Sequence, residues 1–147
     1  MRWQIIVAGK PALAYAKAGV DEYLLRLRRY LDAELLMVKA GTSGEVSQRL
    51  LEKSQGAYRI VLDERGDRPT TRQFSERIAA LEMRGDVKCV SFLIGASDGH
   101  TQELRNSADW LLSLSSMTMQ HELALVVLLE QIYRVATLRK GEPYHRD

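Results

Sequence analysis

Short apolar runs of strand length alternate with longer stretches of helical periodicity from one end of the chain to the other. Strands that alternate with helices are typical of a parallel sheet flanked by helices, so this pattern predicts the α/β class. The 147 residues leave room for one hydrophobic core, and we predict a single domain over residues 1–147. The strand-like runs are Trp3 to Val7, Leu35 to Val38, Tyr58 to Leu62, Lys88 to Ile94 and Trp110 to Leu114.

Between these runs, apolar residues recur at steps of three and four, which predicts helices. The run from Lys88 to Ile94 is apolar nearly throughout, as expected of a central strand that is covered on both faces. The single cysteine, Cys89, lies in this run and should be a buried thiol. The expected helices span about Pro11 to Leu31, Glu45 to Ser54, Thr70 or Thr71 to Met83, Thr101 to Ser107, and Leu123 to Gly141.

Composition excludes several classes of protein. With 46% hydrophobic and 27% charged residues, the chain should fold rather than remain disordered. A lone cysteine allows neither a disulfide framework nor a cysteine metal site. No segment reaches the roughly 18 uncharged apolar residues of a membrane span, and the first apolar run is too short for a secretory signal. The sequence thus predicts a soluble, cytoplasmic protein, whose formal charge of +2 is compatible with nucleic acid without implying it.

Three loops follow predicted strands at the edge where open α/β sheets bind ligands: Leu62 to Gly66, Ile94 to Gly99, and Leu114 to Gln120. The glycines of the second loop would let the backbone approach a small molecule, although such a segment is more often a plain tight turn. Neither a Walker A motif nor a dinucleotide fingerprint is present. The third loop joins small hydroxyls to Met117 and Met119, which suits a ligand that is part heteroaromatic and part polar; a Ser/Thr-capped helix start is the alternative.

The three histidines lie near the predicted loops and the tail. His121 opens the last helix, where its ring either has a functional role or is simply solvated. His145 lies in the tail. His100 follows a turn and is expected to be solvated. Glu130 and Arg134 stand one helical turn apart, as a surface ion pair or, given their apolar neighbours, as a partly buried one. No histidine and carboxylate cluster has ligand spacing, so we predict no metal site.

Taken together, several of these segments resemble the corresponding segments of one protein family. The chain resembles the ribosomal RNA large subunit methyltransferase H family, of the SPOUT superfamily, over its full length. The matching segments are Gly19 with Glu22-Tyr23, Leu62-Asp63 with Gly66, Phe92-Leu93-Ile94-Gly95 with Gly99, Leu112-Ser113-Leu114-Ser115 with Thr118 and His121, Glu130-Gln131-Ile132-Tyr133-Arg134, and Tyr144-His145-Arg146.

The resemblance implies a fold, a methyl donor and a substrate. The fold is a parallel α/β sheet whose C-terminal part threads a trefoil knot, an arrangement that ordinary topology rules would not suggest. The donor is S-adenosylmethionine, bound among three loops. Members of the family act as homodimers on 23S ribosomal RNA within the assembled ribosome, where they methylate N3 of a pseudouridine, and the resemblance implies the same for this chain.

The resemblance also assigns roles to residues of this chain. One group would line the methyl-donor pocket, and the other would form a catalytic and RNA-facing group, part of it supplied by the second subunit. The donor-pocket residues are Leu62, Gly95, Ala96, Leu114, Ser115, Ser116, Met117, Thr118, Met119 and Gln120. The catalytic and RNA-facing residues are His121, Glu130, Arg134, Tyr144, His145 and Arg146.

These residue types suit the implied chemistry. The donor is already activated, so the enzyme mainly aligns the attack and helps to remove a weakly acidic imide proton from N3. A neutral imidazole, of His145 or of His121, would accept that proton, since a pKa near 6.5 leaves it partly unprotonated at cellular pH. Arg146 would stabilise the resulting anion or hold a phosphate.

Three positions depart from the family pattern. Ala96 stands where a second glycine is usual, Gln120 replaces a proline and is expected to loosen the third loop, and Leu125 replaces an arginine and removes a charge. These departures leave two alternatives open, a SPOUT enzyme that acts on another RNA such as tRNA, and a catalytically silent RNA-binding relative. The silent relative would use the basic face of the first helix, which carries Lys17, Arg26, Arg28 and Arg29.

Overall fold

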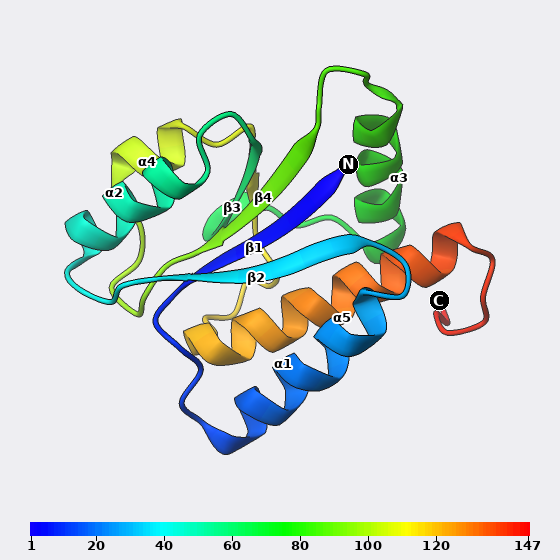
Figure 1. Cartoon of the computed structure of the whole chain (residues 1–147), viewed down its shortest axis with the longest axis horizontal. Coiled ribbons are helices and arrows are strands. Elements are labelled where there is room, and N and C mark those ends of the chain that lie inside the picture. Colours follow the sequence, from blue (N-terminus) through cyan, green and yellow to red (C-terminus); the bar gives the residue numbers. More distant parts are fainter.

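Five parallel strands form a single sheet in the order β2-β1-β4-β3-β5 (Figure 1). The computed structural model describes residues 1–147. Every residue of the middle strand β4 is buried, which confirms the α/β class and the prediction of a central strand there. The strands are β1 (Arg2–Ala8), β2 (Asp32–Val38), β3 (Tyr58–Asp67), β4 (Cys89–Ile94) and β5 (Trp110–Leu112).

Helices cover both faces of the sheet, with α1, α3 and α5 on one face and α2 and α4 on the other (Figure 1). Threonine capping boxes start two of them, because the side chains of Thr42 and Thr70 accept from backbone amides in the first turn. None of the helices is both long enough and apolar enough to span a membrane. The helices are α1 (Ala14–Leu27), α2 (Ser43–Lys53), α3 (Thr71–Met83), α4 (Gln102–Asn106) and α5 (His121–Arg139).

The two helical layers bury two hydrophobic clusters against the sheet. The larger cluster lies under α1, α3 and α5, where Trp3 and Phe92 stack with ring centroids 6.0 Å apart. The smaller cluster joins α2 and α4 to the opposite face. Cys89 is buried in β4, as predicted. Leu125, at the position where the family usually has arginine, is 2% exposed in the larger cluster and contributes to the core.

The first helix is shorter than the sequence predicted. It ends at Leu27, and a tight turn follows, in which the Tyr30 amide donates to the Leu27 carbonyl. The turn is needed because β2 begins to pair with β1 at Asp32. Arg28 and Arg29, which were expected on the basic face of the helix, therefore lie beyond its last residue.

The third strand is longer than predicted, because Asp63 to Asp67 was expected to be a polar loop and continues as strand. Asp67 pairs with Leu112 across a bulge, and the Ser113 amide donates to the Asp67 carbonyl (2.8 Å). The Asp67 side chain also accepts from the indole of Trp110 (3.0 Å). These bonds to β5 hold the polar segment in the sheet, although β5 itself ends at Leu112 rather than at Leu114.

Gly66 is required where β3 and β5 meet. A methyl group at this position would lie 2.7 Å from the Leu112 amide nitrogen and closer still to the Leu111 carbonyl. We expect Gly66→Ala to lower the free energy of unfolding by about 1–3 kcal/mol, as overpacking does. Urea denaturation measures this effect, with Gly44→Ala in α2 as the matched control, since nothing lies within 4 Å of a methyl group there. Equal stability of Gly66→Ala and wild type would contradict the close approach of the strands.

Candidate functional site

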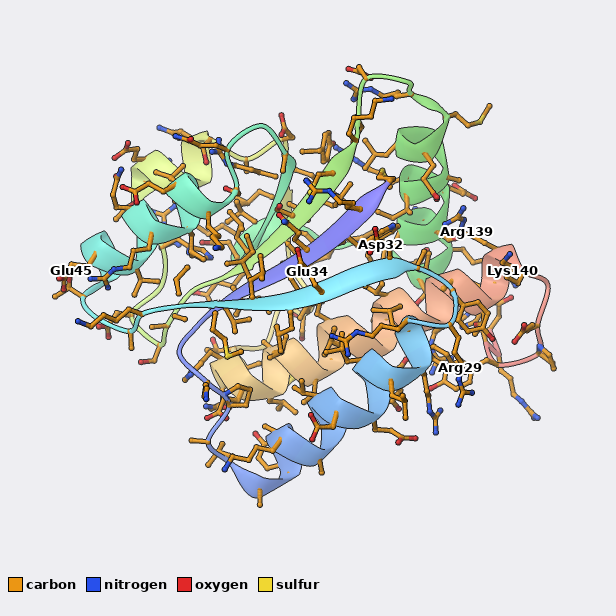
Figure 2. The ribbon with its side chains drawn as sticks, in the orientation of Figure 1. Arg29, Asp32, Glu34, Glu45, Arg139 and Lys140 are labelled. Atoms are coloured by element: carbon orange, nitrogen blue, oxygen red, sulfur yellow. The ribbon has the colours of Figure 1, made fainter.

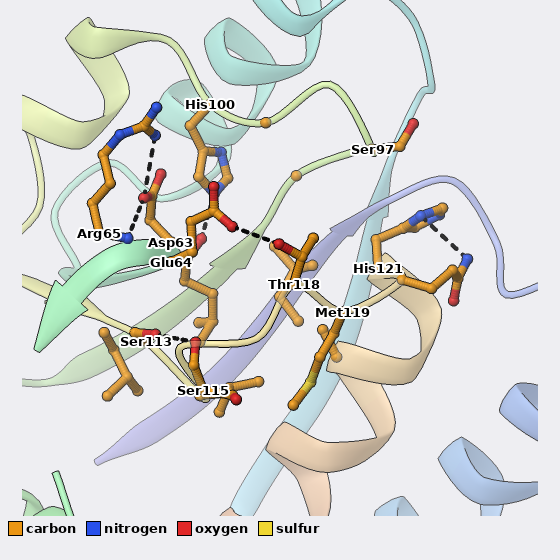
Figure 3. A pocket seen from close by; sticks show the side chains of 18 of the residues that line it. Asp63, Glu64, Arg65, Ser97, His100, Ser113, Ser115, Thr118, Met119 and His121 are labelled. Atoms are coloured by element: carbon orange, nitrogen blue, oxygen red, sulfur yellow. Dashed lines mark hydrogen bonds and ion pairs between the residues drawn. The ribbon is translucent and has the colours of Figure 1, made fainter. Parts of the chain in front are cut away.

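A cavity of about 460 Å³ opens at the carboxyl ends of the adjacent strands β3, β4 and β5. Its walls come from the end of β3, the loop between β4 and α4, and the loop between β5 and α5, so the three loops predicted to collect a ligand do converge (Figure 3). The lining mixes apolar side chains with hydroxyls and carboxylates. This combination suits a ligand with both an aromatic and a polar part.

Nine of the ten residues predicted for the donor pocket line this cavity, and the exception is Ser116, whose side chain is exposed to solvent. Their role toward a donor stays a prediction. The nine are Leu62, Gly95, Ala96, Leu114, Ser115, Met117, Thr118, Met119 and Gln120. Lining residues that were not predicted for the donor pocket include Asp63, Glu64, Ser97, His100 and Ser113.

Hydroxyl groups fix the loop between β5 and α5 and attach it to β3. The Ser113 hydroxyl donates to the Ser115 carbonyl (2.8 Å), and the Ser115 hydroxyl accepts from the Met117 amide (2.9 Å). Thr118 donates to the carboxylate of Glu64 on β3 (3.1 Å), which joins two walls of the cavity (Figure 3). The alternation of hydroxyls with apolar residues in the sequence is the local pattern that produces this arrangement.

The amino end of α5 points toward the cavity. Gln120 caps the helix, since its side-chain oxygen accepts from the amides of Glu122 (2.9 Å) and Leu123 (3.0 Å). The residue that replaces the family's proline therefore gives the third loop an anchor at its end. His121 follows in the first turn and lines the cavity (Figure 3). The partial positive charge of a helix amino end favours a negatively charged ligand group.

His100 is buried, at 8% exposure, and the expectation that it is solvated is wrong. Gly99, with φ of 81°, turns the chain so that the ring enters the protein, where its Nε2 lies 2.8 Å from the Leu62 carbonyl oxygen. The Arg105 guanidinium holds the backbone carbonyl of His100 (2.7 Å). Burial lowers the pKa of the imidazole, which is therefore neutral at cellular pH.

The predicted catalytic residues of the tail form a second cluster, against the carboxyl half of α5. Arg134 forms an ion pair with Glu130 (2.7 Å), with side chains only 24% and 18% exposed, so the partly buried alternative holds. The Arg134 guanidinium lies over the ring of Tyr144, 4.7 Å from its centroid. It also approaches Nδ1 of His145 (3.2 Å). Arg146 is exposed.

The last residue ties this cluster to α3. Asp147 contacts Nε2 of His145 (2.7 Å) and forms an ion pair with Arg72 of α3 (2.7 Å). The Arg72 guanidinium, together with His145, lowers the pKa of Asp147 to about 2. Burial, with a hydrogen bond to Tyr23, raises the pKa of Tyr144 to about 12, so Tyr144 keeps its proton at cellular pH.

Within one chain the two groups of residues are well separated. Glu130, Arg134, Tyr144 and His145 lie together, whereas His121 stays with the cavity. Arg134 lies thirteen positions after His121 on α5, or about 20 Å at 1.5 Å per residue. The tail lies at the far end of that helix from the cavity (Figure 1).

Comparison with known proteins identifies the family. A family model described as "Predicted SPOUT methyltransferase" matches residues 1–145. The chain is 48% identical over 146 residues to the ribosomal RNA large subunit methyltransferase H of Thermus thermophilus, with 99% of each chain covered. It is 42% identical over 146 residues to the protein of the same name from Deinococcus radiodurans, again with 99% of each covered.

Solved structures agree on the fold. The crystal structure of a probable methyltransferase from Bordetella pertussis superposes with a TM-score of 0.60 at 11% identity, covering 92% of this chain and 96% of that one. A probable methylase family protein from Haemophilus influenzae superposes with a TM-score of 0.61 at 8% identity, covering 99% of this chain and 70% of that one. The trefoil knot stays a prediction. The chain belongs to the SPOUT methyltransferases and, among them, to the ribosomal RNA large subunit methyltransferase H family.

Proposed function

We propose that this protein transfers the methyl group of S-adenosylmethionine to N3 of a pseudouridine in 23S ribosomal RNA, within the assembled ribosome in the cytoplasm. The observation that carries the proposal is the cavity at the ends of β3, β4 and β5, in a chain that matches relatives named as ribosomal RNA methyltransferases over nearly all its length. The names of those relatives indicate ribosomal RNA of the large subunit as the substrate. The family resemblance indicates pseudouridine as the nucleoside and N3 as the atom that is methylated.

The lining residues fit this donor. Leu62, Leu114 and Met119 offer apolar surface for an adenine ring, and carboxylate and hydroxyl oxygens of Glu64 and Thr118 suit ribose hydroxyls. The amino end of α5 suits a carboxylate. When bound, S-adenosylmethionine supplies a methyl group on a positively charged sulfur. The residues of the protein would align the target nitrogen with that methyl group and remove the proton from N3.

His145 is the base that the geometry favours for that proton. In the neutral ring, Nε2–H donates to Asp147 and the Nδ1 lone pair accepts from Arg134, so Nδ1 would take the proton from N3 once the guanidinium releases it. Asp147 stays ionised and would stabilise the ring once it becomes cationic. The exposed Arg146 would hold a phosphate or the anionic base. His121, at the cavity, is the other candidate base.

A second copy of the chain would complete the site. The tail contacts Arg134, which lies about 20 Å along α5 from His121 at the cavity, a distance that a single side chain does not bridge. A homodimer that brings the tail of one subunit to the cavity of the other would unite the two groups. Such an arrangement would repeat by symmetry and form two equal sites.

Exposed basic side chains lie where RNA contact is proposed. Arg29 and Lys140 lie at the same end of the molecule as the tail (Figure 2). With Arg146 they would neutralise phosphates, and binding should therefore weaken as salt rises. The net charge of +2 does not reveal this local concentration.

Substrate choice tests the proposal. Methyl transfer from labelled S-adenosylmethionine should mark 23S RNA in ribosomes from a strain that lacks the gene, and should leave bulk tRNA unlabelled. Ribosomes from the parent strain serve as the control, since their target is already methylated. Label in tRNA alone would indicate a different RNA substrate. Donor binding without transfer to either RNA would indicate a silent RNA-binding relative.

A further inference from the structure

His100 connects three segments that form or support the cavity wall. Its Nε2–H donates to the Leu62 carbonyl at the edge of the cavity (2.8 Å). Its own carbonyl accepts from Arg105 of α4 (2.7 Å), and its ring packs against Gly95 at the end of β4. Leu62, Gly95 and His100 all line the cavity (Figure 3). One imidazole therefore sets the spacing between the end of β3 and the glycine turn.

The ring and Gly95 are matched in size. A methyl group on residue 95 would lie 2.8 Å from Cε1 and 2.9 Å from Nδ1 of His100, which is closer than side-chain contacts allow. The backbone of Gly95 does not adopt positive φ, so the glycine is needed for space rather than for conformation. The imidazole occupies the space that a side chain at residue 95 would need.

The buried environment favours the neutral ring. Because Nε2 donates its hydrogen to Leu62, Nδ1 carries the lone pair, and this atom is buried without a hydrogen-bond partner. Protonation would place a hydrogen on Nδ1 with no acceptor beside it. Burial, the largest effect, lowers the pKa of His100; Asp63 of β3 opposes this and Arg105 of α4 adds to it. Gly95, the contact from β4, carries no charge.

We propose that His100 is a positioning residue of the donor cavity, which as a neutral imidazole holds the Leu62 carbonyl and the turn from Gly95 to Gly99 in the shape that receives S-adenosylmethionine. The inference rests on the proposed function, because it concerns the same ligand. A protonated His100 would add a positive charge to the wall of the cavity that is proposed to hold the positively charged donor. Acid should therefore weaken donor binding more than binding of the uncharged thioether product, S-adenosylhomocysteine.

Three substitutions separate positioning from mere packing. In His100→Gln the side-chain amide can still donate to the Leu62 carbonyl and cannot titrate, whereas Asn is too short to reach it and Leu has no donor. Calorimetry with donor and product should show a loss of affinity on the order of tenfold for His100→Leu and His100→Asn. His100→Gln should stay within about threefold of wild type.

The pH dependence provides the readout that packing alone would not change. Wild-type affinity for the donor should fall only at a pH below the ordinary titration range of histidine, because burial lowers the pKa of His100, while His100→Gln should show no such fall. His121 also lines the cavity, and His121→Gln should therefore keep the acid loss if His100 causes it. Nitrogen-15 spectra of labelled histidine should show His100 as the Nε2–H form, titrating below the usual range.

The outcomes distinguish this inference from the proposed function. Wild-type protein that does not bind S-adenosylmethionine at all would overturn the proposed function and this inference with it. Wild-type binding that His100→Leu leaves unchanged would overturn only the role of His100. Thermal unfolding checks that each variant is folded. If His100→Leu does not fold, His100→Gln decides, because an unchanged acid loss in that variant would refute the proposal.

Discussion

Replacing His145 and Arg146 together by alanine should lower methyl transfer to ribosomes by about a hundredfold or more, because the change removes the proposed base and a cation that contacts RNA. Affinity for the donor should stay within about threefold of wild type, since neither residue lines the cavity. Single-turnover rates with saturating ribosomes, measured beside donor calorimetry, separate the two effects.

The single variants then divide the roles. His145→Ala should lower the rate of the chemical step, and Arg146→Ala should weaken ribosome binding and reduce its dependence on salt. Lys53→Ala is the matched control, because this exposed cation ends α2 in the opposite helical layer. Wild-type transfer by both single variants would remove the tail from the proposed site.

Mixing two inactive variants should restore activity, which is the second large effect. Ala96→Trp places a bulky side chain at the cavity and should abolish donor binding, while His145→Ala leaves the cavity intact. If the tail of one subunit serves the cavity of the other, each mixed dimer has one site with both parts unaltered. Equal mixing with free exchange of subunits should then restore about one quarter of wild-type activity.

The same experiment reveals a site contained in a single chain. If each chain used its own tail, every site in every mixture would carry one of the two defects, and no activity would return. Light scattering should show a dimer for both variants and for the mixture. Exchange is verified by labelling one variant with a tag of different mass, so that failure to mix is not mistaken for a negative result.

The fold follows closely from local patterns in the sequence. Alternating strand-like and helical runs predicted the sheet, and the apolar run ending at Ile94 identified its central strand, because burial on both faces leaves a local signal. The length of β3 could not be foreseen. Its polar segment from Asp63 to Asp67 is held by bonds to β5, which lies more than forty residues later. Such pairing depends on contacts that no local window contains.

The cavity was predictable and His100 was not. Loops after parallel strands meet at one edge, which explains why Leu62, Gly95 and the loop before α5 converge. The burial of His100 depends on the missing side chain of Gly95, at the start of the same loop, and on the carbonyl of Leu62, which comes from β3. A polar residue after a glycine turn gives no local sign of this.

The contacts around the tail, too, were only partly predictable from the sequence. The spacing of Glu130 and Arg134 predicted their ion pair, since residues four apart share a helix face. The contacts of His145 with Arg134, and of Asp147 with Arg72, arise only when the tail folds back on α5 and α3. The catalytic roles came from the family resemblance, because an imidazole and a guanidinium in a short polar tail have no spacing that specifies a reaction.

Mass spectrometry of 23S ribosomal RNA nucleosides from a strain that lacks the gene tests the central proposal most directly. N3-methylpseudouridine should disappear from that RNA and return when the wild-type gene is restored, but not when the His145→Ala, Arg146→Ala double variant is restored. Persistence of the methylated nucleoside in the strain without the gene would contradict the proposed function.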